Sequence, residues 1–197
     1  LGEGTKAEAI SEINNTSAAL AYLGDSIVHW IKLQENSFAA EAYHFEFRAT
    51  ILDELLPLHE RMAAEKDNII LVNMRKELHC MQDPVILKII LHNLLINANK
   101  FTPKGTITIE VNKLDGHLSV KVSDTGVGMP DDIKNNLNQM RAVNSRKGTN
   151  KESGWGLGYR LIIELLKTCS GRLRVQSAEE KGSSVEIILP EPFFEEK

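Results

Sequence analysis

The feature that most constrains the fold is an apolar stretch that begins at Asp83 and Pro84. An acidic residue followed by proline is typical of a helix start. The apolar residues that follow recur at helical spacing and form one face: Leu87, Ile90, Leu91, Leu94, Leu95 and Ala98. Such a stripe has to be covered by another layer of the protein, so the sequence predicts a core helix here.

The segments around this helix alternate between strand and helix patterns. Asp115-Gly116 separates two β-rich runs, which is typical of a hairpin turn. The predicted strands are 43–47, 69–72, 106–111, 118–122, 173–175 and 185–189, and the further helices are 49–64 and 159–168. Helices mixed with strands that are mostly antiparallel near the end predict an α+β fold, a two-layer α/β sandwich.

The N-terminal region has a different pattern. Residues 5–34 contain no proline and carry a heptad seam, formed by Ile10, Ile13, Ser17, Leu20, Gly24, Ile27 and Ile31. Such a coiled-coil-like helix packs either on its own domain or on a partner helix, and the small seam residues favour a partner. We therefore divide the chain into a stalk helix, 1–40, and a folded domain, 41–197.

Composition excludes several classes of function. The 197 residues carry a formal charge of −4, so no overall basic field favours nucleic acid. Cys80 and Cys169 lack metal-type spacing, as expected of reduced thiols in a cytosolic protein. No stretch reaches the ~18 apolar residues of a membrane span. The start lacks an initiator Met, so we expect a cytoplasmic part of a longer protein, which would meet a membrane only through other segments.

Three short segments carry the candidate chemistry, and the first lies on the Asp83 helix. Asn93, Asn97 and Lys100 fall at i, i+4 and i+7, so they share one face beside the apolar stripe. Amide oxygens suit Mg²⁺, and a lysine ammonium suits phosphate oxygens. The same residues are equally compatible with an ordinary solvated helix face.

The second segment, 123–130, directly follows a predicted strand and contains Asp124, Gly126 and Gly128. A carboxylate there can accept a hydrogen bond from an exocyclic amine, and the glycines allow close backbone approach. A tight turn with an Asp cap is the alternative interpretation.

The third segment, Gly154-Trp155-Gly156-Leu157-Gly158, runs into a helix, where free N–H groups and the helix dipole favour anions. The polar stretch 126–158 lacks firm periodicity, and a long stretch of this kind inside a compact domain predicts a lid.

In their order and spacing, the three segments resemble the ATP-binding catalytic domain of sensor histidine kinases, in the gyrase, Hsp90, histidine kinase and MutL ATPase superfamily. Residues 93–102 resemble the N-box, 124–130 the first glycine box and 154–158 the second, and Gly182-Ser183-Ser184 resembles the family's end. The likeness extends over residues 45–190. It implies the Bergerat ATP-binding fold, with ATP and Mg²⁺ as cofactors.

The resemblance also implies a role for each site residue. Asn97 would hold Mg²⁺ with Asn93 beside it, Lys100 would contact phosphates, and Asp124 would accept from the adenine amino group. The remaining nucleotide-binding residues would be Gly126, Gly128, Gly154, Gly156, Leu157 and Gly158. Asn93 stands where hydrolytic relatives carry a glutamate. An amide cannot act as a base, which favours phosphoryl transfer to a protein histidine.

The implied partners are a second copy of the chain, joined through the N-terminal helix, and the receiver domain of a response regulator. The departures from the family pattern are Asn99, Leu137, Met140, Trp155 and Tyr159. Because the bulk of Trp155 would lie beside phosphates, the alternative function is a nucleotide-binding or dimer-scaffold module with little turnover. A hydrolytic ATPase of the same superfamily is the third possibility.

The phosphoacceptor histidine is expected outside this chain. His44 lies in a sequence like an acceptor box, but too few residues separate it from Asn97 for a two-helix hairpin. His29 lies off the heptad seam, and His92 is interpreted as a helix-surface residue. The stalk helix is interpreted as the second helix of a dimerisation hairpin whose first helix carries the acceptor.

Overall fold

The computed structural model describes residues 24, 28, 40–141 and 157–191. The chain divides into two units, 1–38 and 39–197. In the first unit, Gly24 and Val28 are helical and exposed, in agreement with the predicted helix, and the rest of the heptad seam lies outside the described residues. Within the described ranges, no helix has the length and apolarity that crossing a membrane requires.

The second unit is built on a five-stranded sheet with the order β2-β4-β5-β7-β6. These strands are β2 (Ile69–Met74), β4 (Thr106–Leu114), β5 (His117–Asp124), β6 (Arg172–Ser177) and β7 (Ser183–Pro190). β2 pairs in parallel with β4, and the other pairs are antiparallel. The predicted hairpin at Asp115-Gly116 is confirmed, with both residues at positive φ, 50° and 71°.

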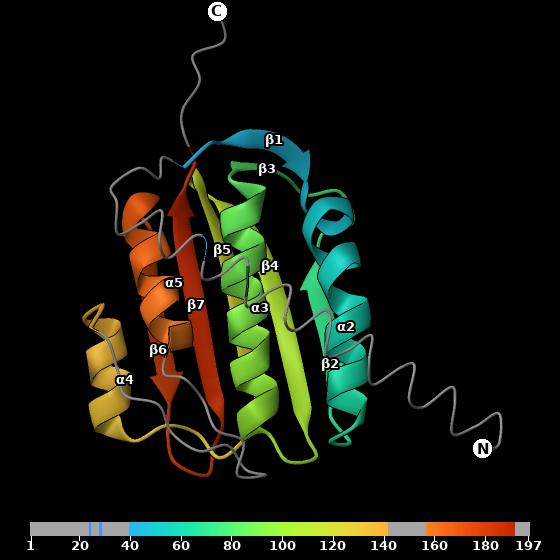
Figure 1. The fold of residues 1–197 in the computed structure, drawn as a ribbon, viewed down its shortest axis with the longest axis vertical. Helices are drawn as coiled ribbons and strands as arrows, with labels where there is room; N and C mark the ends of the chain where they lie inside the picture. Colours follow the sequence, from blue (N-terminus) through green and yellow to red (C-terminus); the bar gives the residue numbers. More distant parts are fainter. Residues whose placement is uncertain (1–23, 25–27, 29–39, 142–156, 192–197) are drawn as a thin grey trace, which may run out of the picture. The chain divides into compact units, whose positions relative to one another are not determined.

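The helices cover one face of this sheet. Figure 1 shows α2 (Asp53–Ala64), α3 (Pro84–Phe101) and α5 (Leu157–Thr168) side by side, with α4 (Asp131–Asn138) beside β6. Along β4, Ile107 and Ile109 are fully buried, whereas Thr106 and Thr108 are only partly buried. This period of two separates a helix-covered face from an open face. The predicted two-layer α+β sandwich is confirmed.

Helix α3 crosses the centre of the domain, as its sequence predicted. The Asp83 side chain caps it, with Oδ1 accepting from Val85 N at 2.9 Å and from Ile86 N at 3.1 Å. The predicted stripe is buried along its whole length: Leu87, Ile90, Leu91, Leu94, Leu95 and Ala98 are each at most 4% exposed. Burying one large aliphatic side chain contributes about 2 kcal/mol, so α3 is a main source of stability.

Two elements differ from the prediction. A second, two-stranded sheet pairs β1 (Tyr43–Glu46) with β3 (His79–Gln82), and β3 was not predicted. The periodic segment 49–64 is not a single helix, because a π-helical turn at Arg48–Leu52 precedes α2. The two-stranded sheet is attached to the end of β7, where Gln82 Nε2 donates to Pro190 O at 2.8 Å.

The interpretation of 126–158 as a stretch without regular structure was wrong for its first part. This part contains α4, which covers the edge of the sheet through Leu137, a fully buried side chain. The predicted departure at Leu137 is therefore a packing residue. Residues 142–156, with Trp155, Gly154 and Gly156, lie outside the described part of the chain.

Candidate functional site

Asn93, Asn97 and Lys100 form a polar row on one face of α3, which starts with Asn93. Its Nδ2 donates to Ile89 O at 2.8 Å, one turn back along the helix, so the amide nitrogen is bound locally. Asn97 follows one turn later and has a buried Nδ2 with no hydrogen-bond partner in the described part of the chain. Lys100 is partly exposed in the last turn, with Nζ 5.3 Å from the centroid of the Phe101 ring.

The first turn of α5 lies directly against this row. A Cβ on residue 158 would lie 3.1 Å from Asn93 Oδ1 and 3.6 Å from Asn97 Nδ2. Gly158 therefore allows the backbone of α5 to approach both amides closely. Two of the three predicted segments thus meet in the structure.

The second segment forms a turn at the end of β5. Asp124 Oδ1 accepts from Gly126 N at 2.9 Å, and Val127 N donates to Phe101 O at 3.0 Å. A Cβ on Gly126 would overlap the Phe101 carbonyl, so the turn sits directly on the C-terminal end of α3. This turn therefore lies on the residue that directly follows Lys100, the last member of the polar row.

Two further glycines hold the turn from the other side. Gly128 has a φ of +70°, and a Cβ there would overlap Ala178 O. Gly182, in the β6–β7 turn, has a φ of +78°, and a Cβ there would overlap Asp124 O. Both positions therefore require glycine for conformation and for space.

The Asp124 carboxyl has an unusual electrostatic environment. Burial raises the pKa of Asp124 above its ordinary value, and hydrogen bonds from the Gly126 amide and Ser183 oppose the shift. Burial also raises the pKa of Tyr159, and the negative charge of Asp124 adds to that rise. Since Tyr159 lies in the first turn of α5, the start of that helix comes near the carboxylate.

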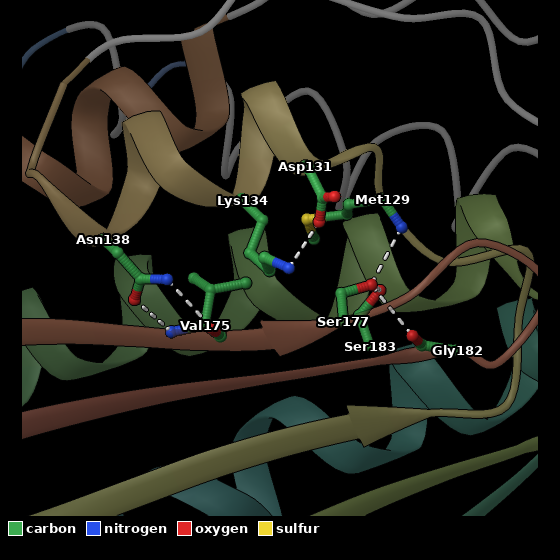
Figure 2. A network of polar contacts seen from close by, with 8 residues as sticks. All are labelled: Met129, Asp131, Lys134, Asn138, Val175, Ser177, Gly182 and Ser183. Atoms are coloured by element: carbon green, nitrogen blue, oxygen red, sulfur yellow. Dashed lines mark hydrogen bonds and ion pairs between the residues drawn. The ribbon is translucent and has the colours of Figure 1, made fainter.

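A hydroxyl network below this turn was not predicted (Figure 2). Ser177 Oγ accepts from Met129 N at 2.8 Å and donates to Gly182 O at 2.9 Å, and it lies 3.1 Å from Ser183 Oγ. Ser183 in turn hydrogen bonds to Asp124. The only signal in the sequence was the Gly182-Ser183-Ser184 motif, which did not indicate which residue Ser183 contacts.

The histidine beside the polar row is not on the surface, so the interpretation of His92 as a surface residue was wrong. His92 is 8% exposed, and its Nδ1 lies 3.0 Å from Nε2 of His59, which is 2% exposed on α2. Burial lowers the pKa of His59 to about 3, with a further contribution from His92, and burial lowers the pKa of His92 to about 4. Both rings are therefore neutral near pH 7.

The donors of the polar row fit a magnesium ion that arrives with a phosphate ligand. Among the described residues there is no cluster of three His, Cys, Asp or Glu side chains that could hold a metal alone. Mg²⁺ usually takes one or two protein oxygens and keeps waters and phosphate oxygens. The Asn93 oxygen beside Gly158 is an acceptor of the kind that Mg²⁺ takes, whereas the unpartnered Asn97 Nδ2 is an N–H donor that suits a phosphate oxygen.

A two-layer sandwich in which a helix amide row, a partly buried aspartate turn and the first turn of α5 lie close together fits a nucleotide-binding ATPase domain. The chain belongs to the family of histidine kinase-, DNA gyrase B- and HSP90-like ATPases, whose model matches residues 82–192. The predicted family is confirmed, and the match begins next to the Asp83 cap of α3.

Curated relatives that match include sensor kinases. The autoinducer 2 sensor kinase/phosphatase LuxQ of Vibrio vulnificus is 30% identical over 90% of this chain. The signal transduction histidine-protein kinase BarA of Escherichia coli is 26% identical over 91% of it. The chain spans about a fifth of the length of each, 21% and 20% respectively. It is therefore similar to one region of these longer kinases.

Solved structures share the fold. Full-length ShkA in complex with AMPPNP superposes with a TM-score of 0.70 at 20% identity, covering 98% of this chain and 40% of that one. The catalytic domain of the histidine kinase ThkA gives a TM-score of 0.64 at 20% identity, covering 77% of this chain and 96% of that one. At this identity the likeness concerns the fold alone.

Proposed function

We propose that this chain is the ATP-binding catalytic domain of a two-component sensor histidine kinase. In the complete protein, the γ-phosphoryl of ATP would pass to a histidine of the stalk and then to the receiver domain of a response regulator. The observation that carries the proposal is the approach of Gly158 to Asn93 and Asn97, with the Asp124 turn placed on the C-terminal end of the same helix.

Asp124 would read the base. Its carboxylate, held by Gly126 N at 2.9 Å, keeps acceptor capacity for the exocyclic amine of adenine. Burial raises the pKa of Asp124, and hydrogen bonds from the Gly126 amide and Ser183 act against that rise and favour the ionised form, which is the form that accepts. Gly126 and Gly128 would leave room for the base by bringing their backbones close to α3 and to the β6–β7 turn.

Asn97, with Asn93 beside it, would hold Mg²⁺, and Lys100 would contact the phosphates. When bound, Mg²⁺ supplies charge neutralisation for the triphosphate. The first turn of α5, Leu157 and Gly158, would contribute backbone N–H groups at a helix N-terminus, where anions bind favourably. Gly154 and Gly156 complete the proposed phosphate-binding set.

Asn93 favours transfer over hydrolysis. A hydrolytic enzyme needs a base to activate water, and an amide cannot take up the proton. The amide nitrogen of Asn93 is also fixed to Ile89 O, so this side chain orients ligands and does not exchange protons. Phosphoryl transfer needs mainly positioning and neutralised charge, which the proposed site would supply with Mg²⁺ and Lys100.

The acceptor histidine is expected outside the domain. The five described histidines have structural contacts: His59 with His92, His44 stacked on His79 at 5.3 Å, and His117 Nδ1 2.8 Å from Asp115 O. His44 lies within β1, which supports rejecting it as the acceptor. The same proposal places the domain in the cytoplasm, as a homodimer joined through the N-terminal helix.

Titration with Mg-ADP by calorimetry tests nucleotide binding. Asp124→Asn should bind at least about thirtyfold more weakly, because the amide cannot match a carboxylate as an acceptor for the adenine amine. Asp131→Asn is the matched control, since Asp131 is an exposed carboxylate that pairs with Lys134 at 2.5 Å. Equal binding by the wild type and both variants would contradict the assignment of Asp124.

Transfer is tested with labelled ATP. The chain alone should bind ATP but accumulate no acid-labile phosphate, and it should label a dimerisation hairpin that carries an acceptor histidine when the hairpin is supplied separately. Steady release of inorganic phosphate would favour a hydrolytic ATPase instead. Binding without either reaction would favour the scaffold module.

A further inference from the structure

Asn99 is the departure from the family pattern that lies closest to the polar row, and it is buried. Its side chain is 8% exposed, although it sits between Asn97 and Lys100 on α3. Asn99 Nδ2 donates to Met62 O, near the end of α2, at 3.0 Å. Its Oδ1 accepts from Asn68 Nδ2 at 2.8 Å. The Asn99 side chain therefore connects the polar helix to the segment that leads into β2.

Asn68 is the centre of this network and is 5% exposed. Besides Asn99, its Nδ2 donates to Thr102 O at 2.8 Å, and its Oδ1 accepts from Gly105 N at 2.7 Å. Both amide protons and the oxygen of one side chain are thus used. The loop that follows α3 is fixed at both ends by a single residue from another element.

Lys66 adds two bonds to the same helix end. Its Nζ donates to Asn99 O at 2.9 Å and to Lys100 O at 3.1 Å. These are among the last carbonyls of α3, which have no partner within the helix. A lysine is electrostatically favourable at a helix C-terminus. The segment 62–68 therefore holds α3 at the position where Lys100 is presented.

The opposite side of the same loop contacts the Asp124 turn. Phe101 O accepts from Val127 N at 3.0 Å, and a Cβ on Gly126 would overlap that carbonyl. Thr102 is fully buried, and its Oγ1 donates to Ala98 O at 2.7 Å and would lie 2.8 Å from a Cβ on Gly126. A shift of residues 101–102 would thus move the carboxylate and the end of the polar row together.

We infer that Asn68 and Asn99 are positioning residues for the nucleotide site, which hold the end of α3 in register with the Asp124 turn. The inference rests on the proposed function, because the position of Asp124 matters only if it reads a base. A purely structural pair could be replaced by apolar residues at a cost in stability alone. A positioning pair must also change base recognition.

The experiment compares Asn99→Leu with Gln82→Leu. Gln82 is a matched control because it is a buried amide, 5% exposed, that donates to Pro190 O at 2.8 Å just before the other end of α3. Binding of ADP and of IDP, which lacks the exocyclic amine, is measured by calorimetry, and unfolding is followed by circular dichroism.

The expected result is that both variants melt at lower temperature. Only Asn99→Leu should weaken the binding of ADP, by about tenfold. Asn99→Leu should also reduce the preference for ADP over IDP, which Gln82→Leu should leave unchanged. If Asn99→Leu does not fold, the truncation Asn68→Ser, which removes the amide that bonds to Asn99 and Thr102, is measured in its place, with the same reduced preference for ADP over IDP expected.

Two failures are distinguishable. A folded wild-type chain that binds no ADP would overturn the proposed function itself. A wild-type chain that binds ADP, with an ADP-to-IDP preference that is equal in the wild type, Asn99→Leu and Gln82→Leu, would overturn only the inference and leave Asn99 a structural residue.

Discussion

The proposed base-reading side of the site and its phosphate side are constructed differently. On the base side, Asp124 accepts from Gly126 N, and Gly182 packs directly on the Asp124 carbonyl. On the phosphate side, the buried Asn97 Nδ2 has no partner within the described residues. The base side is therefore held by the protein alone, whereas the phosphate side has polar capacity for a ligand.

The difference indicates how affinity and activity are divided. Groups already fixed in the folded chain bind without a further loss of conformational entropy, so the base side should determine affinity for the nucleotide. The phosphate side, with two neutral amides and one lysine, needs the charge of the ligand and its metal to be completed. The predictions below test whether the two sides differ in rigidity.

The largest effect is expected for Gly182→Ala. A Cβ at this position would overlap Asp124 O, and the residue has a φ of +78°. Both the overlap and the backbone strain act on the folded state, so we expect a loss of about 4 kcal/mol in the free energy of unfolding. Urea unfolding measures it. Gly158→Ala is the control, because a Cβ there would meet only side-chain atoms, those of Asn93 and Asn97.

A loss of less than about 1 kcal/mol for Gly182→Ala would contradict a rigid base side. The turn would then be free to move away from the new methyl group. The comparison between the two sides would lose its basis in that case, because both would adapt to a ligand.

The second effect is a loss of stability in acid, caused by the His59–His92 pair that joins α2 and α3. Near pH 7 the buried His59–His92 pair is neutral, with pKa values of about 3 and about 4 against 6.5 for an unperturbed histidine. The unfolded chain therefore takes up protons first as the pH falls. The two neutral rings contribute their full stability above about pH 6.5. This contribution is lost toward pH 4, at up to ~1.4 kcal/mol per pH unit for each histidine.

Urea unfolding at several pH values checks this prediction, with an expected loss of about 3 kcal/mol for the two histidines together between pH 6.5 and 5. Replacing both His59 and His92 by leucine should remove this part of the slope. His117→Gln should keep it, because His117 is exposed in the β4–β5 hairpin. An unchanged slope in the double variant would show that carboxylates, and not this pair, determine the acid sensitivity.

Patterns that depend on neighbours in sequence predicted much of the fold. The stripe and Asp83 cap of α3, and the Asp115-Gly116 hairpin, are local signals, and the structure confirms them. Strand β3 was missed because its buried positions are Cys80 and Gln82, and a glutamine does not mark an apolar face as the alternating aromatic residues of β1 do. Helix α4 was missed because Leu137 is its only buried residue.

For the site, the order of the three segments was readable, but the partners of its polar residues were not. His92 and Asn99 looked like surface or departing residues because their partners, His59 and Asn68, lie 33 and 31 positions away. A polar side chain on a helix can be buried only when another residue, here one distant in sequence, provides its hydrogen bonds. The roles assigned to Asn93, Asn97, Lys100 and the glycines stay predictions.

A third, smaller effect is expected for Gly158→Ala on the phosphate side. A Cβ there would lie 3.1 Å from Asn93 Oδ1, which is tight but can be relieved by a small rotation of the side chain. We expect little change in stability and a loss of about 1 kcal/mol in Mg-ATP binding, roughly fivefold, measured by calorimetry. A destabilisation as large as that of Gly182→Ala would contradict the comparison, since the phosphate side would then be packed as rigidly.

The smallest effect concerns the helix that follows the base-reading turn. Asn138, in the last turn of α4, donates from Nδ2 to Val175 O at 2.9 Å and accepts at Oδ1 from Val175 N at 2.8 Å (Figure 2). Since β6 is an edge strand, this amide takes the place of a neighbouring strand. Asn138→Ala should cost about 0.5–1 kcal/mol, because the freed backbone groups can bond to water.

Hydrogen exchange at Val175 N is the sharper measurement for Asn138→Ala, because only a direct partner protects that amide. Faster exchange at Val175 with unchanged exchange at Gly126 would mean that α4 is attached to the sheet independently of the Asp124 turn. Faster exchange at both would mean that α4 supports the turn, and the rigid base side would then extend to the sheet edge. Asn135→Ala, on an exposed position of the same helix, should change neither.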